Sequence, residues 1–466
     1  MSNSNDDSAS NTPDSPPDQP PYPSPKVAWF TVTVLMIAYI FSFVDRTILT
    51  FLVEPIKADL GISDMKMSLL MGFSFAFFYT IFGLPIGRLA DSRNRKGIIA
   101  IGMLAWTVAT GACGFVKNYW QFLLARIGVG VGEAALSPAA YSLVTDMFPK
   151  EKLARALSVY SMGIFIGAGL ASGVGGGVAS WAANKGDIDL GLFGTVYPWQ
   201  LAFIVIGVVG LAPIGLILLI KEPVRRGARL VKTADGGEKI ESVPVREIAT
   251  YILANWKTFF CHHIGFAILA FSSWGVGAWG VAFMYRTHGW GPGQSGFYFM
   301  LHVIVAGCLG IVSGGILCDR LAKRGRTDAP MIVGLMASAL WIPTGIMYPI
   351  VSNGWVAWGF MIPTYFFTAF ATGVAAAAIQ QIVPNAMRGQ VSAFYLFAVN
   401  MIGMGIGPTG VAFFTDYVFR DESMLRYSIL IVGIGCHSLA IPCFWFGRKH
   451  FRNSVEYLKK WEADNA

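Results

Sequence analysis

Long apolar stretches recur along almost the whole chain, and short polar segments separate them. The stretches cover about 27–52, 67–90, 97–116, 120–147, 154–183, 198–220, 257–285, 294–318, 330–351, 354–383, 388–418 and 426–447. Each is long enough for an α-helix that crosses the hydrocarbon core of a bilayer, which takes about 20 residues. The pattern predicts an all-α membrane protein with twelve transmembrane helices in two groups of six.

The segments outside these stretches predict how the chain is divided. Residues 1–25 are rich in Ser, Asn, Asp and Pro, which is typical of a disordered tail, and they lack the basic and apolar regions of a signal peptide. Residues 221–256 are charged and contain no long apolar run, so we expect a linker there. The linker joins two six-helix halves, 26–220 and 257–447, and a polar tail, 448–466, follows.

The basic residues predict the orientation in the membrane. If the N-terminus is cytoplasmic, 26 of the 35 Lys and Arg residues fall in cytoplasmic segments, seven fall on the opposite side and two lie within spans. Cytoplasmic loops of membrane proteins carry such an excess of positive charge. We therefore expect both termini in the cytoplasm.

The composition and the absence of certain motifs argue against several classes of function. Hydrophobic residues make up 54% of the chain and charged residues only 13%, and the net charge of +8 comes from loops rather than from a nucleic-acid-binding surface. The six cysteines lie in apolar stretches without the spacing of metal ligands. No phosphate-binding loop is present, which disfavours transport driven by ATP. We expect no cofactor, no metal site and no nucleic-acid partner.

One motif occurs in both halves, 228 positions apart. The chain reads GRLADSRNRK after the second stretch and GILCDRLAKR after the eighth, both with the pattern G-x-L-x-D-x-x-x-[RK]-[KR]. A basic loop alone would not explain the repeated Gly and Asp. Two parallel repeats predict a pseudo-twofold axis along the membrane normal, with the substrate path between the halves. The motif residues expected to act in gating are Gly87, Asp91, Arg95, Lys96, Asp319 and Arg324.

Four ionisable residues lie within apolar stretches of the first half. They are Asp45 and Arg46 in the first stretch and Arg126 and Glu133 in the fourth. Such residues are costly at membrane depth and usually face a partner or a water-filled path. We interpret them as the charged wall of a central cavity; the alternative is that they only join helices to one another.

Helix geometry predicts how these four residues pair. Arg126 and Glu133 are seven residues apart, so they share one helix face about 10 Å apart along the axis. Side chains tilt toward the N-terminus of their helix, so Arg46 is expected to reach Glu133. Asp45, which points about 100° away from Arg46, is then expected to face Arg126.

These segments resemble a known family. The Gly–Leu–Asp–Arg–Lys motif is similar to that of the major facilitator superfamily, and the resemblance extends over the chain beyond the N-terminal tail. FVDRTIL, GRLADSRNRK and RIGVGVGEAALSPAAYSLVTDMFP together resemble the Spinster family of lysophospholipid and sphingosine-1-phosphate carriers. The resemblance implies a major facilitator fold, alternating access, and a role for Asp91 in stabilising the outward-facing state.

The predicted function is secondary active transport of an amphipathic lipid, coupled to protons. Arg46 and Arg126 would hold an anionic head group with Glu133, and the acyl chain would lie against a largely apolar wall from the second half, where Thr368 corresponds to Glu133. Glu133 and Asp45 are the candidate proton sites. We expect a monomer in a bacterial inner membrane.

Two other functions were considered. A proton-coupled symporter of small organic anions would use the same two arginines to bind a carboxylate. An intramembrane enzyme would need a nucleophile and a base, or metal ligands, facing one cavity, and the sequence offers no such set.

Overall fold

The computed structural model describes residues 21–189, 191, 194–225, 230–232, 238–240, 244–384 and 387–464. Most of the tail that we expected to be disordered, residues 1–20, lies outside this part. A few side chains within helices, including that of Asp91, also lie outside it.

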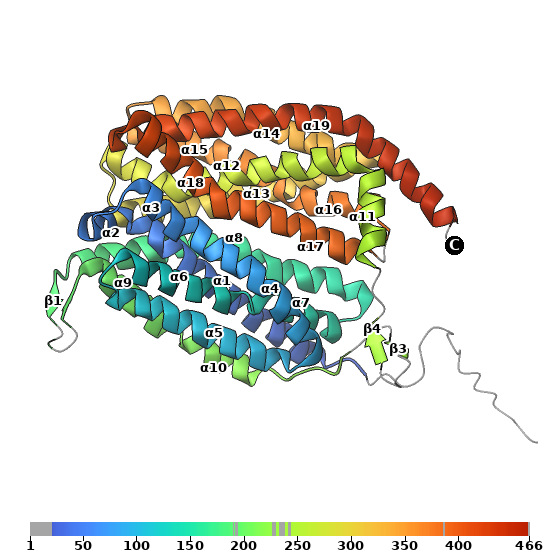
Figure 1. The fold of residues 1–466 in the computed structure, drawn as a ribbon, viewed down its shortest axis with the longest axis horizontal. Coiled ribbons are helices and arrows are strands. Elements are labelled where there is room, and N and C mark those ends of the chain that lie inside the picture. Colours follow the sequence, from blue (N-terminus) through green and yellow to red (C-terminus); the bar gives the residue numbers. More distant parts are fainter. Residues whose placement is uncertain are drawn as a thin grey trace, which may run out of the picture.

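The first half is a bundle of helices, drawn from blue to green in Figure 1. The second expected span is built from η1 and α4, the fourth from α6 and α7, and the sixth from α9 and α10. Asparagine side chains cap the N-termini of α5 and α6. Asn94 accepts a hydrogen bond from the Gly97 N–H, and Asn118 accepts one from the Gln121 N–H. The elements are α1 (Pro25–Phe51), α2 (Val53–Leu60), α3 (Asp64–Ser68), η1 (Leu69–Phe73), α4 (Ser74–Ser92), α5 (Arg95–Ala112), η2 (Cys113–Phe115), α6 (Tyr119–Glu133), α7 (Leu136–Met147), α8 (Lys150–Ala183), β1 (Ile188–Asp189), β2 (Thr195–Val196), α9 (Pro198–Val209) and α10 (Ala212–Leu219).

The second half lies beside the first and is drawn from yellow to red (Figure 1). Its elements are α12 (Trp256–His288), α13 (Pro292–Lys323), α14 (Ala329–Ile350), α15 (Gly354–Phe370), α16 (Thr372–Ile382), α17 (Arg388–Val399), η5 (Asn400–Ile406), α18 (Gly407–Phe413), η6 (Phe414–Phe419), η7 (Glu422–Met424) and α19 (Leu425–Asp464). α1 begins and α19 ends at the same end of the bundle. We call the opposite end, where α2, α3 and the β1–β2 hairpin lie, the distal end (Figure 1).

The expected membrane-spanning helices are present. Within the described residues, eleven helices are long and apolar enough to cross a bilayer. The fifth expected span is the 34-residue helix α8, which is not among the eleven and several of whose side chains lie outside the described part. The chain is an all-helical integral membrane protein, as the apolar pattern predicted, and eleven of the twelve expected spans meet this test in the described residues.

The described parts of the linker and of the C-terminal tail form secondary structure. The linker contains a hairpin of β3 (Leu230–Lys232) and β4 (Glu238–Ile240) and then α11 (Val245–Ala254), which packs against the second half. The Tyr251 hydroxyl donates a hydrogen bond to the Ile382 carbonyl oxygen (2.8 Å). The helix of the last expected span does not end near residue 447. α19 continues to Asp464, and Phe451 and Leu458 in this continuation are buried.

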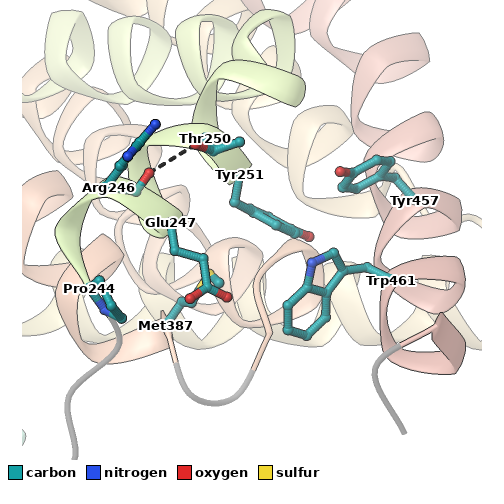
Figure 2. A pocket seen from close by; sticks show the side chains of 8 residues that line it. All are labelled: Pro244, Arg246, Glu247, Thr250, Tyr251, Met387, Tyr457 and Trp461. Atoms are coloured by element: carbon teal, nitrogen blue, oxygen red, sulfur yellow. Dashed lines mark hydrogen bonds between the residues drawn. The ribbon is translucent and has the colours of Figure 1, made fainter.

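A surface hollow of about 330 Å³ lies where α11, the start of α17 and the end of α19 meet. Tyr251, Tyr457 and Trp461 surround it, and their rings meet edge to face (Figure 2). Edge-to-face pairs stabilise by about 0.5–1.5 kcal/mol each beyond the area that they bury. These contacts attach the linker helix and the C-terminal helix to each other and to the second half.

The two halves approach most closely along α8 and α13. A Cβ atom on Gly176 would lie 2.4 Å from the Pro292 carbonyl oxygen, and one on Gly296 would lie 2.6 Å from the Ser172 carbonyl oxygen. Only glycine permits backbones to approach so closely. The glycine-rich sequence of the fifth span therefore forms part of the interface between the halves.

Candidate functional site

Arg46 and Glu133 form an ion pair inside the first half. Arg46 Nη2 lies 2.5 Å and Nε 2.6 Å from Glu133 Oε2, and the Ser42 hydroxyl donates to the same oxygen (2.8 Å). Ser42 and Arg46 are one turn apart on α1, so both reach the last residue of α6 from one face. The predicted pairing of Arg46 with Glu133 is confirmed.

Aromatic rings of α1 and α4 surround the Arg46 guanidinium. Its central carbon lies 4.6 Å from the ring centre of Phe75 and 5.2 Å from those of Phe43 and Tyr79. Cation–π contacts of this kind strengthen when water is excluded. The side chain is 13% exposed, so the guanidinium is held in place but remains accessible from one side.

Arg126 does not form the predicted ion pair with the Asp45 carboxylate. Its Nη1 donates instead to the main-chain carbonyl oxygen of Asp45 (3.3 Å), and its Nε has no hydrogen-bond partner in the described part of the chain. Asp45 and Arg126 are therefore neighbours, as expected, and the charge of Arg126 acts on the Asp45 carboxylate. The hydrogen bond goes to the main chain, however, and no direct ion pair between the two side chains is found in the described structure.

A cavity of about 310 Å³ lies between the two halves and next to these charges. Arg46 and Arg126 line it from the first half, as predicted. Glu133 is buried behind Arg46 and does not line the cavity, so the predicted direct contact between Glu133 and a substrate has no support in the geometry. The cavity is at the small end of the usual range for ligand sites.

The wall from the second half is less apolar than we expected. Phe299, Met361 and Trp341 line it, but so do several hydroxyl groups and an imidazole. Thr368 lines the cavity as predicted; its hydroxyl accepts a hydrogen bond from Trp341 Nε1 (3.0 Å) and donates one to the Thr364 carbonyl oxygen (3.0 Å). Polar side chains of this wall to which the sequence analysis gave no role include Ser272, Ser273, His302, Tyr348, Thr364, Tyr365 and Thr372.

The first copy of the repeated motif makes its contacts inside the first half. Arg95 is fully buried and forms ion pairs with Asp146 at the end of α7 and with Glu222, which follows α10. Lys96 Nζ donates to the Leu218 carbonyl oxygen (3.3 Å). These two motif residues therefore join helices of one half to the start of the linker.

The second copy of the motif is not equivalent. Lys323, which occupies the position of Arg95 in the second copy, is exposed, as are Asp319 and Arg324, whereas Arg95 is buried. In the second half the buried charge is Asp328, which pairs with Arg326 (3.1 Å) and Arg448 (2.9 Å). The Asp91 side chain lies outside the described residues, so its predicted gating role stays a prediction.

Glu222 supplies a pH-dependent contribution to stability. Partial burial alone would raise its pKa, but hydrogen bonds from Arg95 and from the Lys96 backbone N–H outweigh burial and lower the pKa. The carboxylate therefore stabilises the folded state above the ordinary pKa of about 4.3, and this contribution is lost as pH falls through the lower folded value. Glu222→Gln is expected to destabilise by about 1 kcal/mol at pH 7, and the difference from the wild type is expected to shrink steadily as pH falls below the ordinary carboxyl pKa. Thermal unfolding at several pH values measures this, with the exposed Glu247→Gln as control. A difference that stays constant across the acidic range would contradict it.

A second ion-pair network joins the two halves at the distal end. Arg286 at the end of α12 binds both oxygens of Asp64 on α3 (2.6 and 2.8 Å) and also contacts Glu54 (2.8 Å). Lys57 pairs with the same Asp64 and with Glu422 (2.6 Å). Sequence reasoning missed this network, since it treated Lys57 and Arg286 only as loop charges.

The chain is similar to known transporters over much of its length. The chain is 28% identical to an MFS-type efflux pump of Mycolicibacterium smegmatis over 438 residues, which are 92% of this chain and 95% of that protein. It is 28% identical to protein spinster of Drosophila melanogaster over 67% of this chain and 49% of that protein. It is 24% identical to a probable L-galactonate transporter of Escherichia coli over 66% of each chain.

The fold is also that of a solved transporter. A crystal structure of a bacterial homologue of the human lysosomal transporter Spinster, inward-facing and unoccupied, superposes with a TM-score of 0.76 over 94% of this chain and 99% of that one, at 22% identity. The family model described as Major Facilitator Superfamily matches residues 35–408. With this match and the two six-helix halves, the chain belongs to the Major Facilitator Superfamily and resembles its Spinster members.

Proposed function

We propose that this transporter moves an amphipathic organic anion of the lysophospholipid or sphingoid-phosphate type by alternating access. One observation carries the proposal: the guanidinium groups of Arg46 and Arg126 border one cavity, in which aromatic and aliphatic side chains line most of the remainder. Arg46 is the head-group contact, because its planar fork suits a phosphate. Arg46 is already paired with Glu133, so an arriving anion competes for the guanidinium.

The proposed orientation follows the charge bias. Both termini are cytoplasmic in a bacterial inner membrane, and the distal end faces outward. The distal network then closes the outer side of the substrate path, and the transporter acts as a monomer. Asp91 is proposed to favour the outward-facing state by holding the inner ends of the halves together.

Reconstituted protein tests the substrate class. Liposomes that contain the purified transporter are assayed for flux, and the detergent-solubilised protein for thermal stabilisation, with lysophosphatidate, sphingosine phosphate and glucuronate. The proposal expects saturable flux of a lipid phosphate that depends on Arg46. Flux of glucuronate alone would contradict it.

Small hydroxylated organic anions are the second candidate. The polar side chains on the wall from the second half favour them, since a sugar acid needs hydrogen-bond partners on both walls. The similarity to a probable L-galactonate transporter also supports this second candidate. The same flux assay separates the two classes.

Proton coupling is proposed to involve Glu133. An anion that occupies Arg46 weakens the Arg46–Glu133 pair, which favours a proton on Glu133; because coupling is reciprocal, that proton favours anion binding. Asp45 is the next candidate. The alternative is a permanent salt bridge that never titrates.

Glu133→Gln mimics the protonated carboxyl and is expected to retain substrate binding while transport loses its pH dependence. The Gln side chain keeps the shape and can still accept the Ser42 hydrogen bond. Flux under an imposed proton gradient measures the effect, with binding affinity recorded on the same protein. A response to the gradient equal to that of the wild type would exclude Glu133 as the coupling site.

A further inference from the structure

His302 is a buried polar side chain with unused hydrogen-bonding capacity. It lies on α13 and is only 2% exposed; the Tyr298 backbone one turn earlier is near one ring nitrogen, and no hydrogen bond of good geometry reaches Nδ1 or Nε2 among the described residues. A neutral imidazole carries one N–H donor and one acceptor nitrogen, so Tyr298 can occupy only one of them, and leaving the other unpaired in a buried place is costly. A polar group in the cavity would satisfy the remaining nitrogen.

The surroundings of His302 fix the ring and orient it into the cavity. The Phe299 ring centre lies 4.8 Å from that of the imidazole, and the Tyr365 ring centre lies 5.1 Å away. All three side chains line the cavity that Arg46 and Arg126 border. The aromatic neighbours hold the imidazole without satisfying its nitrogens.

A second unpartnered polar group lines the same cavity. The Ser272 hydroxyl on α12 is 1% exposed and also has no hydrogen-bond partner in the described structure. By contrast, the Thr364 and Thr368 hydroxyls on this wall donate to main-chain carbonyl oxygens of their own helix. The unpartnered buried polar groups of this wall in the described structure therefore include His302 and Ser272, together with the Tyr348 hydroxyl.

We propose that His302, with Ser272, forms a subsite that binds a hydroxyl group of the substrate. A hydroxyl both donates and accepts, which matches a neutral imidazole in either tautomer. The two guanidinium groups on the opposite half bind the anionic end, so the substrate is an organic anion with a hydroxyl group near its charge. This rests on the proposed function and deepens it, since a lysophospholipid, a sphingoid phosphate and a sugar acid all share that chemistry.

Matched ligands that differ by one hydroxyl test the subsite. Binding of oleoyl lysophosphatidate and of its 2-deoxy analogue is measured on the purified full-length protein, and glucuronate and a deoxy analogue form a second arm. The wild type is expected to prefer the hydroxylated ligand of the class that binds by about 10- to 100-fold. His302→Phe keeps the ring but removes both nitrogens, and it is expected to abolish the preference. His302→Gln restores a donor and an acceptor, and it is expected to recover part of it.

The deoxy ligand is the internal control for folding. His302→Phe is expected to bind the deoxy analogue as tightly as the wild type does, because that ligand offers nothing to the imidazole. If His302→Phe retains the full preference, or if the wild type has none, the subsite holds only water and the proposal is overturned. Arg46→Ala combined with Glu133→Gln, which leaves no unpaired buried charge, reports on the anionic end in the same assay, so failure of the head-group proposal is distinguishable from failure of the hydroxyl subsite.

Discussion

Arg46→Ala is expected to abolish transport. The substitution removes the guanidinium that borders the cavity and leaves the Glu133 carboxylate buried without its ion-pair partner. Loss of one member of a buried pair costs about 3–5 kcal/mol unless the remaining group takes up a proton. The flux in liposomes and the thermal unfolding temperature at pH 7 should therefore both fall. Arg46→Lys keeps the charge but loses the fork, and it is expected to retain only a fraction of the flux.

A double variant separates the binding role of Arg46 from its structural role. Arg46→Ala with Glu133→Gln has no buried unpaired charge, so its thermal stability should return toward that of the wild type. Transport should remain absent, because the head-group contact is still missing. Normal flux of an anionic substrate in the double variant would show that Arg46 only compensates Glu133.

Asp64→Asn is expected to open the distal end. Asp64 is fully buried and accepts from both Lys57 and Arg286, so it holds α3 of the first half to α12 of the second. Removal of its charge leaves two buried cations with weaker compensation, at a cost of about 3–5 kcal/mol to the closed arrangement. The ratio of distally closed to distally open molecules should therefore fall by about 100-fold or more.

Distances between spin labels at Lys185 and Ser352, both exposed and on opposite halves, measure the change. The labels require a background in which the six native cysteines are replaced. Asp59→Asn is the matched control, because Asp59 lies at the same end but accepts from Trp199 within its own half (3.1 Å). A distance distribution that is equally unchanged in both variants would contradict a gating role for the network.

The pairing of buried charges was only partly predictable. The Arg46–Glu133 pair follows from helix direction and side-chain tilt, because Arg46 is one turn from Ser42 and both reach the end of α6. Asp45 lies near Arg126 as expected, but Arg126 donates a hydrogen bond to the Asp45 main-chain carbonyl oxygen instead of pairing with the carboxylate. Periodicity predicts which face a residue occupies, but it does not predict whether a guanidinium meets a carboxylate or a carbonyl.

The sequence by itself determined the features that depend on local chain properties. Apolar length predicted the membrane spans, the charge bias predicted an orientation, and the repeated motif predicted two similar halves. The tertiary structure alone decided which distant residues meet. Arg286 and Asp64 are 222 positions apart, and no local pattern marks them as partners. His302 and Ser272 resemble ordinary polar residues of apolar helices until packing places both, with unused hydrogen-bonding capacity, in the lining of the cavity that the arginines border. The physical reason is that burial and hydrogen-bond satisfaction are properties of docked helices, so they are set only when the two halves come together.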